Sequence, residues 1–334
     1  MKFNGYEVIV QYLDIGRKGD IEVHSKKIDK SNRHCIFCCK SSPDVTFSKV
    51  AHAIPETMGN KSLFSHFECD QCNEEFGAFF EDSLGKYLFP FKLVSQIYGK
   101  KNKLISKDKI DDKEFSYGSY LIQTNKNIPV LEGMSAKGLI VENTSSNILS
   151  MTEDGFTLNI HRQHYIPERV YCAFLKMAYS LLPLELYPHY LKRYILLQQV
   201  AMKKSEIFTE EEKKQHMEEF PNCGVRGFLP GINPYNGINA YLFQKKDDIS
   251  TLPSLIFYIE MGNFSFAIPV LADDEIGDFK LPKIELAANE GCSVLIFNTE
   301  EPVFECSFSA LKLEISESQL MDLEKWLKQN NPLK

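Results

Sequence analysis

Alternating hydrophobic and polar residues mark two short strands in the first third of the chain. Residues 44–53 carry valine, threonine and phenylalanine in alternation, and residues 62–68 repeat the pattern. Pro55 ends the first strand, because proline has no backbone N–H to donate to a strand ladder. The segment from Met58 to Lys61, with glycine and asparagine at its centre, is a turn sequence. The pattern therefore predicts two strands joined by a loop.

The hydrophobic period then changes to that of a helix. Phe76, Phe80 and Leu84 fall on one stripe of the helix that the spacing predicts. Asp70 suits the N-cap of this helix, and Gly85 suits its end. The first third of the chain is therefore predicted to contain a strand–strand–helix unit.

Residues 117–334 have the pattern of a larger domain that mixes helices and strands. Pro167 suits the first position of a long apolar helix, and a second helix is expected over residues 184–204, with a break near Pro188. Two apolar runs around Gly262 and Asn263 predict a β-hairpin. Further strands are expected at 119–124, 138–142, 155–161, 240–244, 293–298 and 304–309, and further helices at 209–219 and 317–328.

A stretch rich in lysine and aspartate separates the two parts. Residues 100–116 hold few large apolar side chains and are predicted to be a linker. We therefore expect an α+β protein of two domains. Residues 1–116 contain the strand–strand–helix unit, with its core at 33–90, and residues 117–334 form the larger α+β domain.

The composition is that of an ordinary globular protein. The 334 residues are 43% hydrophobic and 25% charged, which excludes a disordered or collagen-like chain. No apolar run approaches the roughly 20 residues that cross a bilayer. The N-terminus has no apolar core of the signal-peptide type. We therefore expect a cytoplasmic protein without a membrane partner.

The cysteines gather in one segment. Five of the nine lie between Cys35 and Cys72, four of them as the pairs CIFC and CDQC, and the odd total argues against a disulfide framework. A two-residue spacer lets both thiolates of a pair reach one tetrahedral ion at about 2.3 Å, so two pairs complete a closed zinc site. The expected ligands of this structural zinc are Cys35, Cys38, Cys69 and Cys72. Cys39 in place of Cys38, and His34, are alternative ligands.

Net charge first argues against a nucleic-acid partner, because the formal charge is −7 and phosphate binding needs clustered cations. The charge is uneven, however. Residues 1–50 hold nine basic against six acidic residues, and residues 86–113 hold eight lysines against three aspartates. Lys100, Lys101 and Lys103 are the expected phosphate contacts, with an ordinary solvated linker as the alternative. The acidic excess lies mainly in the larger domain.

The motif residues of the first domain occur in a distinctive order. His52-Ala53-Ile54-Pro55, then Gly59-Asn60, then Cys72-Asn73 are bracketed by the two Cys-x-x-Cys pairs. Residues 33–90 thereby resemble the HNH endonucleases, which are ββα-metal nucleases. The resemblance implies a metal-dependent endonuclease that hydrolyses phosphodiester bonds in DNA. It also implies Mg²⁺ or Mn²⁺ as the catalytic ion, in addition to the structural zinc.

The resemblance implies a role for each motif residue. His52 is the general base, and its ordinary pKa suits proton abstraction near neutral pH. Asn60 orders the loop and orients the histidine ring through its amide, with an ordinary turn at Gly59-Asn60 as the alternative. Asn73 meets the catalytic ion, with helix capping as its alternative role. His52 as a ligand of the ion is a further alternative.

The sequence departs from the family pattern at two positions. Ala51 stands where many members have Asp or Glu, and Gly77 stands where many have Lys or His. Because Mg²⁺ prefers oxygen ligands, a carboxylate must come from elsewhere. Glu81, eight residues after Asn73 and about 80° round a regular helix, is the expected source. Glu56 and Glu68 are the alternatives, and each is more often a solvated surface carboxylate.

The larger domain carries no assigned motif. His161 with His164 could bind a metal or phosphate, and residues 187–194 could stack bases, but a surface turn and a helix core explain them better. By resemblance, two-part nucleases of this kind often act in antiphage defence, with the second part sensing an activating ligand or binding a protein partner. The competing hypothesis is a zinc-stabilised module that binds nucleic acid or protein, in which Ala51 reflects lost catalysis.

Overall fold

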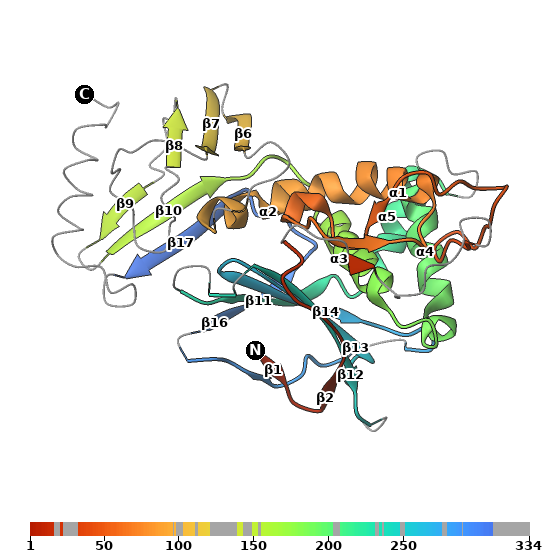
Figure 1. The fold of residues 1–334 in the computed structure, drawn as a ribbon. Helices are drawn as coiled ribbons and strands as arrows, with labels where there is room; N and C mark the ends of the chain where they lie inside the picture. Colours follow the sequence, from red (N-terminus) through yellow and green to blue (C-terminus); the bar gives the residue numbers. More distant parts are fainter. Residues whose placement is uncertain are drawn as a thin grey trace.

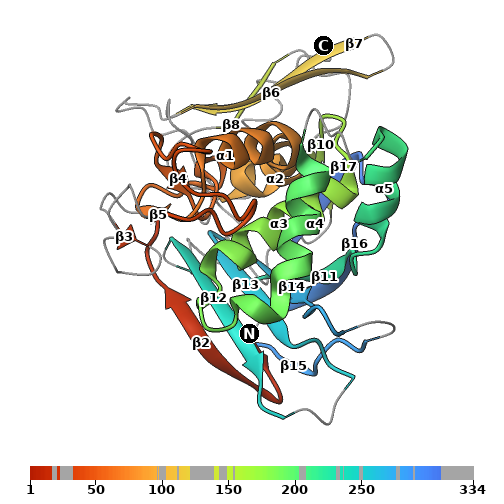
Figure 2. The same cartoon turned by 90° about the vertical axis from the view of Figure 1, so that its right-hand side faces the viewer.

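The structure of the protein is a computed structural model. It describes residues 1–16, 21–22, 33–95, 97, 103–110, 113–120, 139–142, 149–152, 155–202, 208–230, 234–235, 237–247, 251–275, 279–288 and 290–309. An antiparallel sheet, a layer of helices and the cysteine-containing unit follow one another in space (Figures 1 and 2). Within the described residues, no helix is both long and apolar enough to span a membrane.

The largest sheet is antiparallel throughout and has six strands. Their order is β16 (Gly291–Ile296), β11 (Cys223–Phe228), β14 (Phe264–Val270), β13 (Leu255–Met261), β12 (Ile238–Lys245) and β2 (Tyr6–Tyr12). The predicted hairpin is confirmed: β13 and β14 pair from Leu255↔Val270 to Met261↔Phe264. Gly262, in the turn, has a φ of 62°, a conformation that glycine adopts without strain. All seven residues of β14 are buried, because both faces of the sheet are covered.

The N-terminal strands belong to this part of the fold. β2 pairs with β12, and β1 (Lys2–Phe3) pairs with β15 (Ile284–Glu285). Phe3 and Tyr6 pack with Tyr258 on the face of the sheet away from the helices. The division of the chain near residue 116 stays a prediction, and the strand pairing adds that residues 6–12 complete a sheet built mostly from the second part of the chain.

A buried helix connects the sheet to the cysteine-containing unit. Helix α3 (Pro167–Leu181) begins at the predicted proline, and each of its residues from Val170 to Leu181 is buried. It contacts β13 and β14 on one side, and α2 and the turn η3 on the other. The break near Pro188 is confirmed as the short 3₁₀ helix η4 (Tyr187–Tyr190), which is followed by α4 (Leu191–Ala201).

Two further features of the helical layer agree with the sequence patterns. Tyr190 and Tyr194 are buried, so the aromatic run at 187–194 lies partly in the core, as its more ordinary explanation predicts. Helix α5 (Glu210–Glu218) begins with a capping box between Thr209 and Glu212.

The first domain contains the predicted strand–strand–helix unit in short form. Its three-stranded sheet has the order β3 (Ile21–Glu22), β5 (Leu63–Ser65), β4 (Ala51–His52), and the 3₁₀ helix η2 (Glu56–Met58) lies in the loop between β4 and β5. The helical segment runs through α1 (Asp70–Phe76), the π-helical turn η3 (Gly77–Glu81) and α2 (Asp82–Val94) without interruption.

Two predictions about this helix were wrong. Cys69, not Asp70, is the N-cap, because its sulfur accepts a hydrogen bond from the Cys72 backbone. The helix does not end at Gly85 but continues to Val94. The apolar residues around Gly85 are buried, and their packing outweighs the low helix propensity of glycine. These residues are Leu84, Tyr87, Leu88 and Phe91.

The prediction of a linker over residues 100–116 was also wrong. β6 (Lys103–Ile110) and β7 (Lys113–Tyr120) form a hairpin, which β8 (Leu139–Glu142) extends. The linker prediction rested on polar composition alone. These segments form strands because each pairs with a neighbouring strand. A further sheet pairs β10 (Gly155–His161) with β9 (Leu149–Thr152) and β17 (Val303–Ser309), as the patterns at 155–161 and 304–309 predict. The predicted helix at 317–328 lies outside the described residues.

Candidate nuclease site

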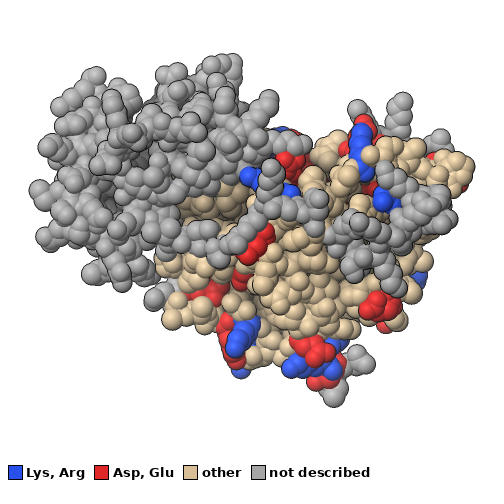
Figure 3. Space-filling view, in the orientation of Figure 1, with Lys and Arg blue, Asp and Glu red and all other residues tan. Residues whose placement is uncertain are grey.

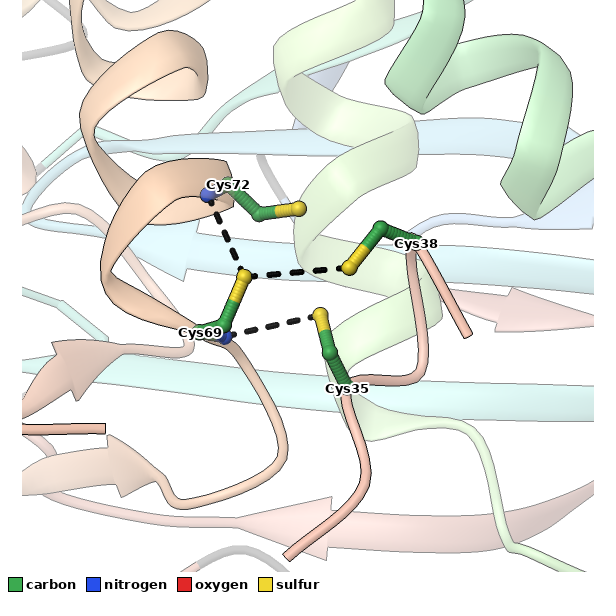
Figure 4. A group of neighbouring side chains, drawn as sticks. All are labelled: Cys35, Cys38, Cys69 and Cys72. Atoms are coloured by element: carbon green, nitrogen blue, oxygen red, sulfur yellow. Dashed lines mark hydrogen bonds between the residues drawn. The ribbon is translucent and has the colours of Figure 1, made fainter. Parts of the chain in front are cut away.

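The four predicted zinc ligands converge. Their sulfur atoms all lie within 4.8 Å of one another, and those of Cys38 and Cys69 are 3.8 Å apart. Figure 4 shows Cys35 and Cys38 on the loop before β4 and Cys69 and Cys72 at the start of α1, with the sulfur atoms turned toward a common centre. Backbone N–H groups of Cys69 and Cys72 donate to the sulfurs of Cys35 and Cys69 at 3.5 Å.

This donor set fits a zinc ion. Four sulfurs at about 2.3 Å from one ion in a tetrahedron lie about 3.8 Å apart, which is the spacing of Cys38 and Cys69. Hydrogen bonding to Cys38 lowers the pKa of Cys35, whereas hydrogen bonding to Cys35, Cys38 and Cys69 raises the pKa of Cys72. Four adjacent thiols cannot all ionise beside one another without a cation, and a divalent ion removes that conflict.

The two alternative ligands lie elsewhere. Cys39 is exposed, and its sulfur lies 3.3 Å from the Tyr187 hydroxyl. The His34 ring is hydrogen-bonded to the Ser41 hydroxyl at 3.1 Å. The structure therefore groups Cys38, not Cys39, with the other three cysteines.

His52 is the last residue of β4. Its half-buried ring packs against Phe64, with ring centroids 5.0 Å apart. Ala51 pairs with Ser65 in the ladder and is 1% exposed, so a methyl group fills the position where many HNH proteins carry a carboxylate. The strand ends where predicted, because Pro55 follows.

Asn60 holds the loop that follows His52. Its amide nitrogen donates to the carbonyl oxygens of Ile54 and Leu63 at 2.5 and 2.9 Å, and its amide oxygen accepts from the backbone of Ser62 and Leu63 at 3.0 and 2.9 Å. These four bonds use both N–H groups and both lone pairs of the amide. The amide of Asn60 is therefore used fully by the main chain of the loop that follows His52.

Asn73 and Glu81 lie on one helix, separated by the π turn. A π turn takes one more residue than an α turn, so the eight-residue spacing corresponds to about seven regular residues, or two turns. Glu81 is thereby rotated onto the face of Asn73, and not about 80° away as a regular helix predicts. Two turns place the two backbones about 11 Å apart along the axis.

Comparison with known protein families finds one match in this part of the chain. Residues 35–89 match the model of the HNH endonuclease family. Residues 35–89 form an HNH endonuclease domain. The match begins at the first zinc-site cysteine and ends inside α2, so it includes His52, Asn60, Asn73 and Glu81. No curated protein and no solved structure matches the chain.

A lysine from the second part of the chain contacts the HNH domain. Lys176, on α3, has a buried side chain whose ammonium group donates to the His52 carbonyl oxygen at 2.9 Å. The same nitrogen lies 3.0 Å from a Glu68 carboxylate oxygen and 3.8 Å from Glu81. Burial alone would lower the pKa of Lys176, but the carboxylates of Glu68 and Glu81 outweigh burial and raise it. Lys176 is therefore an ammonium ion.

Sequence reasoning missed Lys176, although a signal was present. It is the one charged residue in the run Val170–Leu182, and a lone charge on a wholly apolar helix must find a partner when it is buried. Glu68 was expected at the surface but is 2% exposed, with Lys176 as its ion-pair partner. Glu56 is half-buried in η2.

The structure describes one of the three lysines that were expected to contact phosphate. Lys100 and Lys101 lie outside the described residues, and Lys103 begins β6. On the face shown in Figure 3, described acidic and basic side chains occur in small mixed groups. Lys49 pairs with Glu74, and Lys86 with Asp82, on the exposed side of the HNH domain. His164 pairs with Glu300 at the surface, in agreement with the surface-turn explanation.

Proposed function

We propose that this protein is a metal-dependent DNA endonuclease that hydrolyses phosphodiester bonds at its HNH domain. The match of residues 35–89 to the HNH endonuclease family carries the proposal. The arrangement of His52 at a strand end, beside a helix that bears Asn73 and Glu81 on one face, supports it.

His52 is the proposed general base. Its ring stands at the end of β4, packed on Phe64, and the four bonds of Asn60 hold the loop that follows it. A ring nitrogen of His52 takes the proton from the attacking water. A fixed backbone keeps that nitrogen in line with the phosphate, and positioning of this kind supplies much of the catalysis in phosphate chemistry.

Asn73 and Glu81 are the proposed residues that hold Mg²⁺ or Mn²⁺. An amide oxygen and one carboxylate form a suitable set, because Mg²⁺ commonly keeps several waters and takes one or two carboxylates from the protein. When bound, the ion neutralises charge on the scissile phosphate. Lys176 already compensates Glu68, and Ala51 offers no oxygen. Glu56 lies in η2 and not on the helix of Asn73, so Glu81 is the carboxylate proposed to serve the ion.

The setting of the reaction is also part of the proposal. The enzyme acts in the cytoplasm, and residues 117–334 control it through an activating ligand or protein partner, as an antiphage defence effector. The Lys100–Lys103 segment supplies contacts to the DNA backbone.

A plasmid assay tests the proposed activity. Zinc-loaded protein is incubated with supercoiled plasmid and Mg²⁺ or Mn²⁺, and nicked and linear products are measured with and without EDTA. Cleavage is expected to require the added ion and to be lost in His52→Ala. A folded, zinc-loaded His52→Ala protein that still cleaves at the wild-type rate would exclude His52 as the base.

Ala51 favours a second candidate function. A buried methyl group at the position of the usual acidic residue is what a domain that had lost catalysis would show. A zinc-stabilised binding module predicts one zinc per chain and retention of DNA or a protein, without cleavage under any divalent ion. Ion-dependent cleavage that disappears in His52→Ala would exclude this alternative.

A further inference from the structure

We propose that Lys176 is a positioning residue of the nuclease site, so that the second part of the chain completes the HNH domain. This inference rests on the proposed function and deepens it. It comes from one buried ammonium group that contacts three separate segments of the nuclease motif.

The three contacts cover the catalytic parts of the motif. Lys176 holds the carbonyl of His52, the residue that ends β4. It pairs with Glu68, which immediately precedes the zinc-site Cys69, and with Glu81, at the end of the π turn. The ammonium group donates a hydrogen bond to the His52 carbonyl oxygen and forms ion pairs with the two carboxylates. One side chain therefore ties the base, the zinc site and the candidate ion ligand together.

The two carboxylates at this cluster differ in their access to solvent. Glu68 is wholly buried and 3.0 Å from the ammonium, so Lys176 neutralises it. Glu81 is 3.8 Å away with a side chain 26% exposed, so its carboxylate is steadied by Lys176 and still reaches solvent. Residues that orient a metal-binding carboxylate in this way commonly matter for both affinity and activity.

α3 is rigid enough to carry out this role. Its residues from Val170 to Leu181 are all buried between the sheet and the HNH helices, and Phe174, close to Lys176, packs on Phe266 of β14. Packing on both sides therefore holds the α3 backbone at Lys176 in place.

A charge-balanced double variant separates positioning from simple charge compensation. Lys176→Met alone leaves Glu68 buried without a partner, which destabilises the fold. Glu68→Gln/Lys176→Met removes both charges, keeps one net negative charge at the cluster, and is expected to fold, because a buried pair is often replaced at little cost. The same change at an ion pair on α5, between buried Lys213 and exposed Glu210, gives the control Lys213→Met/Glu210→Gln.

Two measurements decide the inference. The first is plasmid cleavage, where the double variant is expected to lose kcat by about tenfold or more with little change in KM. The second is binding of Mn²⁺ alone to the zinc-loaded protein, where Kd is expected to rise by about tenfold, as in Glu81→Gln. The Lys213→Met/Glu210→Gln protein is expected to match the wild type in both.

The outcomes distinguish the two proposals. Wild-type cleavage and Mn²⁺ affinity in a folded Glu68→Gln/Lys176→Met protein would overturn the role of Lys176 and leave the proposed nuclease intact. Cleavage that does not depend on His52 would overturn the proposed function, and the Mn²⁺ measurement would still decide on Lys176. Absence of any Mn²⁺ site in the wild type would overturn the role of Lys176 as well.

Discussion

Replacing Asn60 with alanine is expected to destabilise the protein strongly, because this buried amide holds the loop after His52 with four hydrogen bonds. The variant loses the bonds to the Ile54 and Leu63 carbonyls and from the Ser62 and Leu63 N–H groups. At about 1 kcal/mol for each bond, and with the freed groups buried, the loss is about 4 kcal/mol. That is a large share of the roughly 5–15 kcal/mol that stabilises a typical protein.

The assay is urea denaturation of the zinc-loaded chain, followed by circular dichroism. Asn298→Ala is the control, because this exposed asparagine accepts a hydrogen bond from the hydroxyl of its neighbour Thr299, and its replacement is expected to change stability by less than about 0.5 kcal/mol. A loss below about 1 kcal/mol in Asn60→Ala would show that other contacts hold the loop and that the reasoning from its hydrogen bonds is wrong.

Three further predictions concern the zinc site, a buried lysine and a glycine with a positive φ. Elemental analysis is expected to find one zinc per chain, and Cys69→Ser is expected to lose it and to unfold the HNH domain, which circular dichroism would show; a zinc-free wild type that keeps its fold would contradict this. Burial lowers the pKa of Lys92 from 10.5 to about 8, so the unfolded chain binds more protons than the folded one between these values. Stability against urea is therefore expected to rise with pH from about 8 to 10.5, and the rise should be smaller in Lys92→Met. Gly59 has a φ of 97°, and a Cβ there would lie 2.8 Å from Ile97 and 3.0 Å from Ile238, so Gly59→Ala is expected to lower the thermal midpoint, whereas an unchanged midpoint would show that the loop adjusts freely.

Local patterns in the sequence determined much of this protein. The two Cys-x-x-Cys pairs predict a metal site whose four sulfurs the structure brings within 4.8 Å, and the order of His52, Asn60 and Asn73 predicts the HNH domain that the family comparison finds. The hairpin around Gly262 and the helix start at Pro167 are also found where predicted. Each of these depends on residues close together in the chain, so the spacing alone carries the information.

Other features were decided only by tertiary structure, because they depend on contacts between residues far apart in the sequence. The helix continues past Gly85 because its apolar side chains are buried by distant segments, and the turn at Gly77–Glu81 sets Glu81 on the face of Asn73. β2 completes a sheet whose other strands begin after residue 222. Lys176 lies more than 90 residues from Glu81 along the chain, yet its charge could remain buried only where carboxylates met it, and folding placed those carboxylates in the nuclease motif.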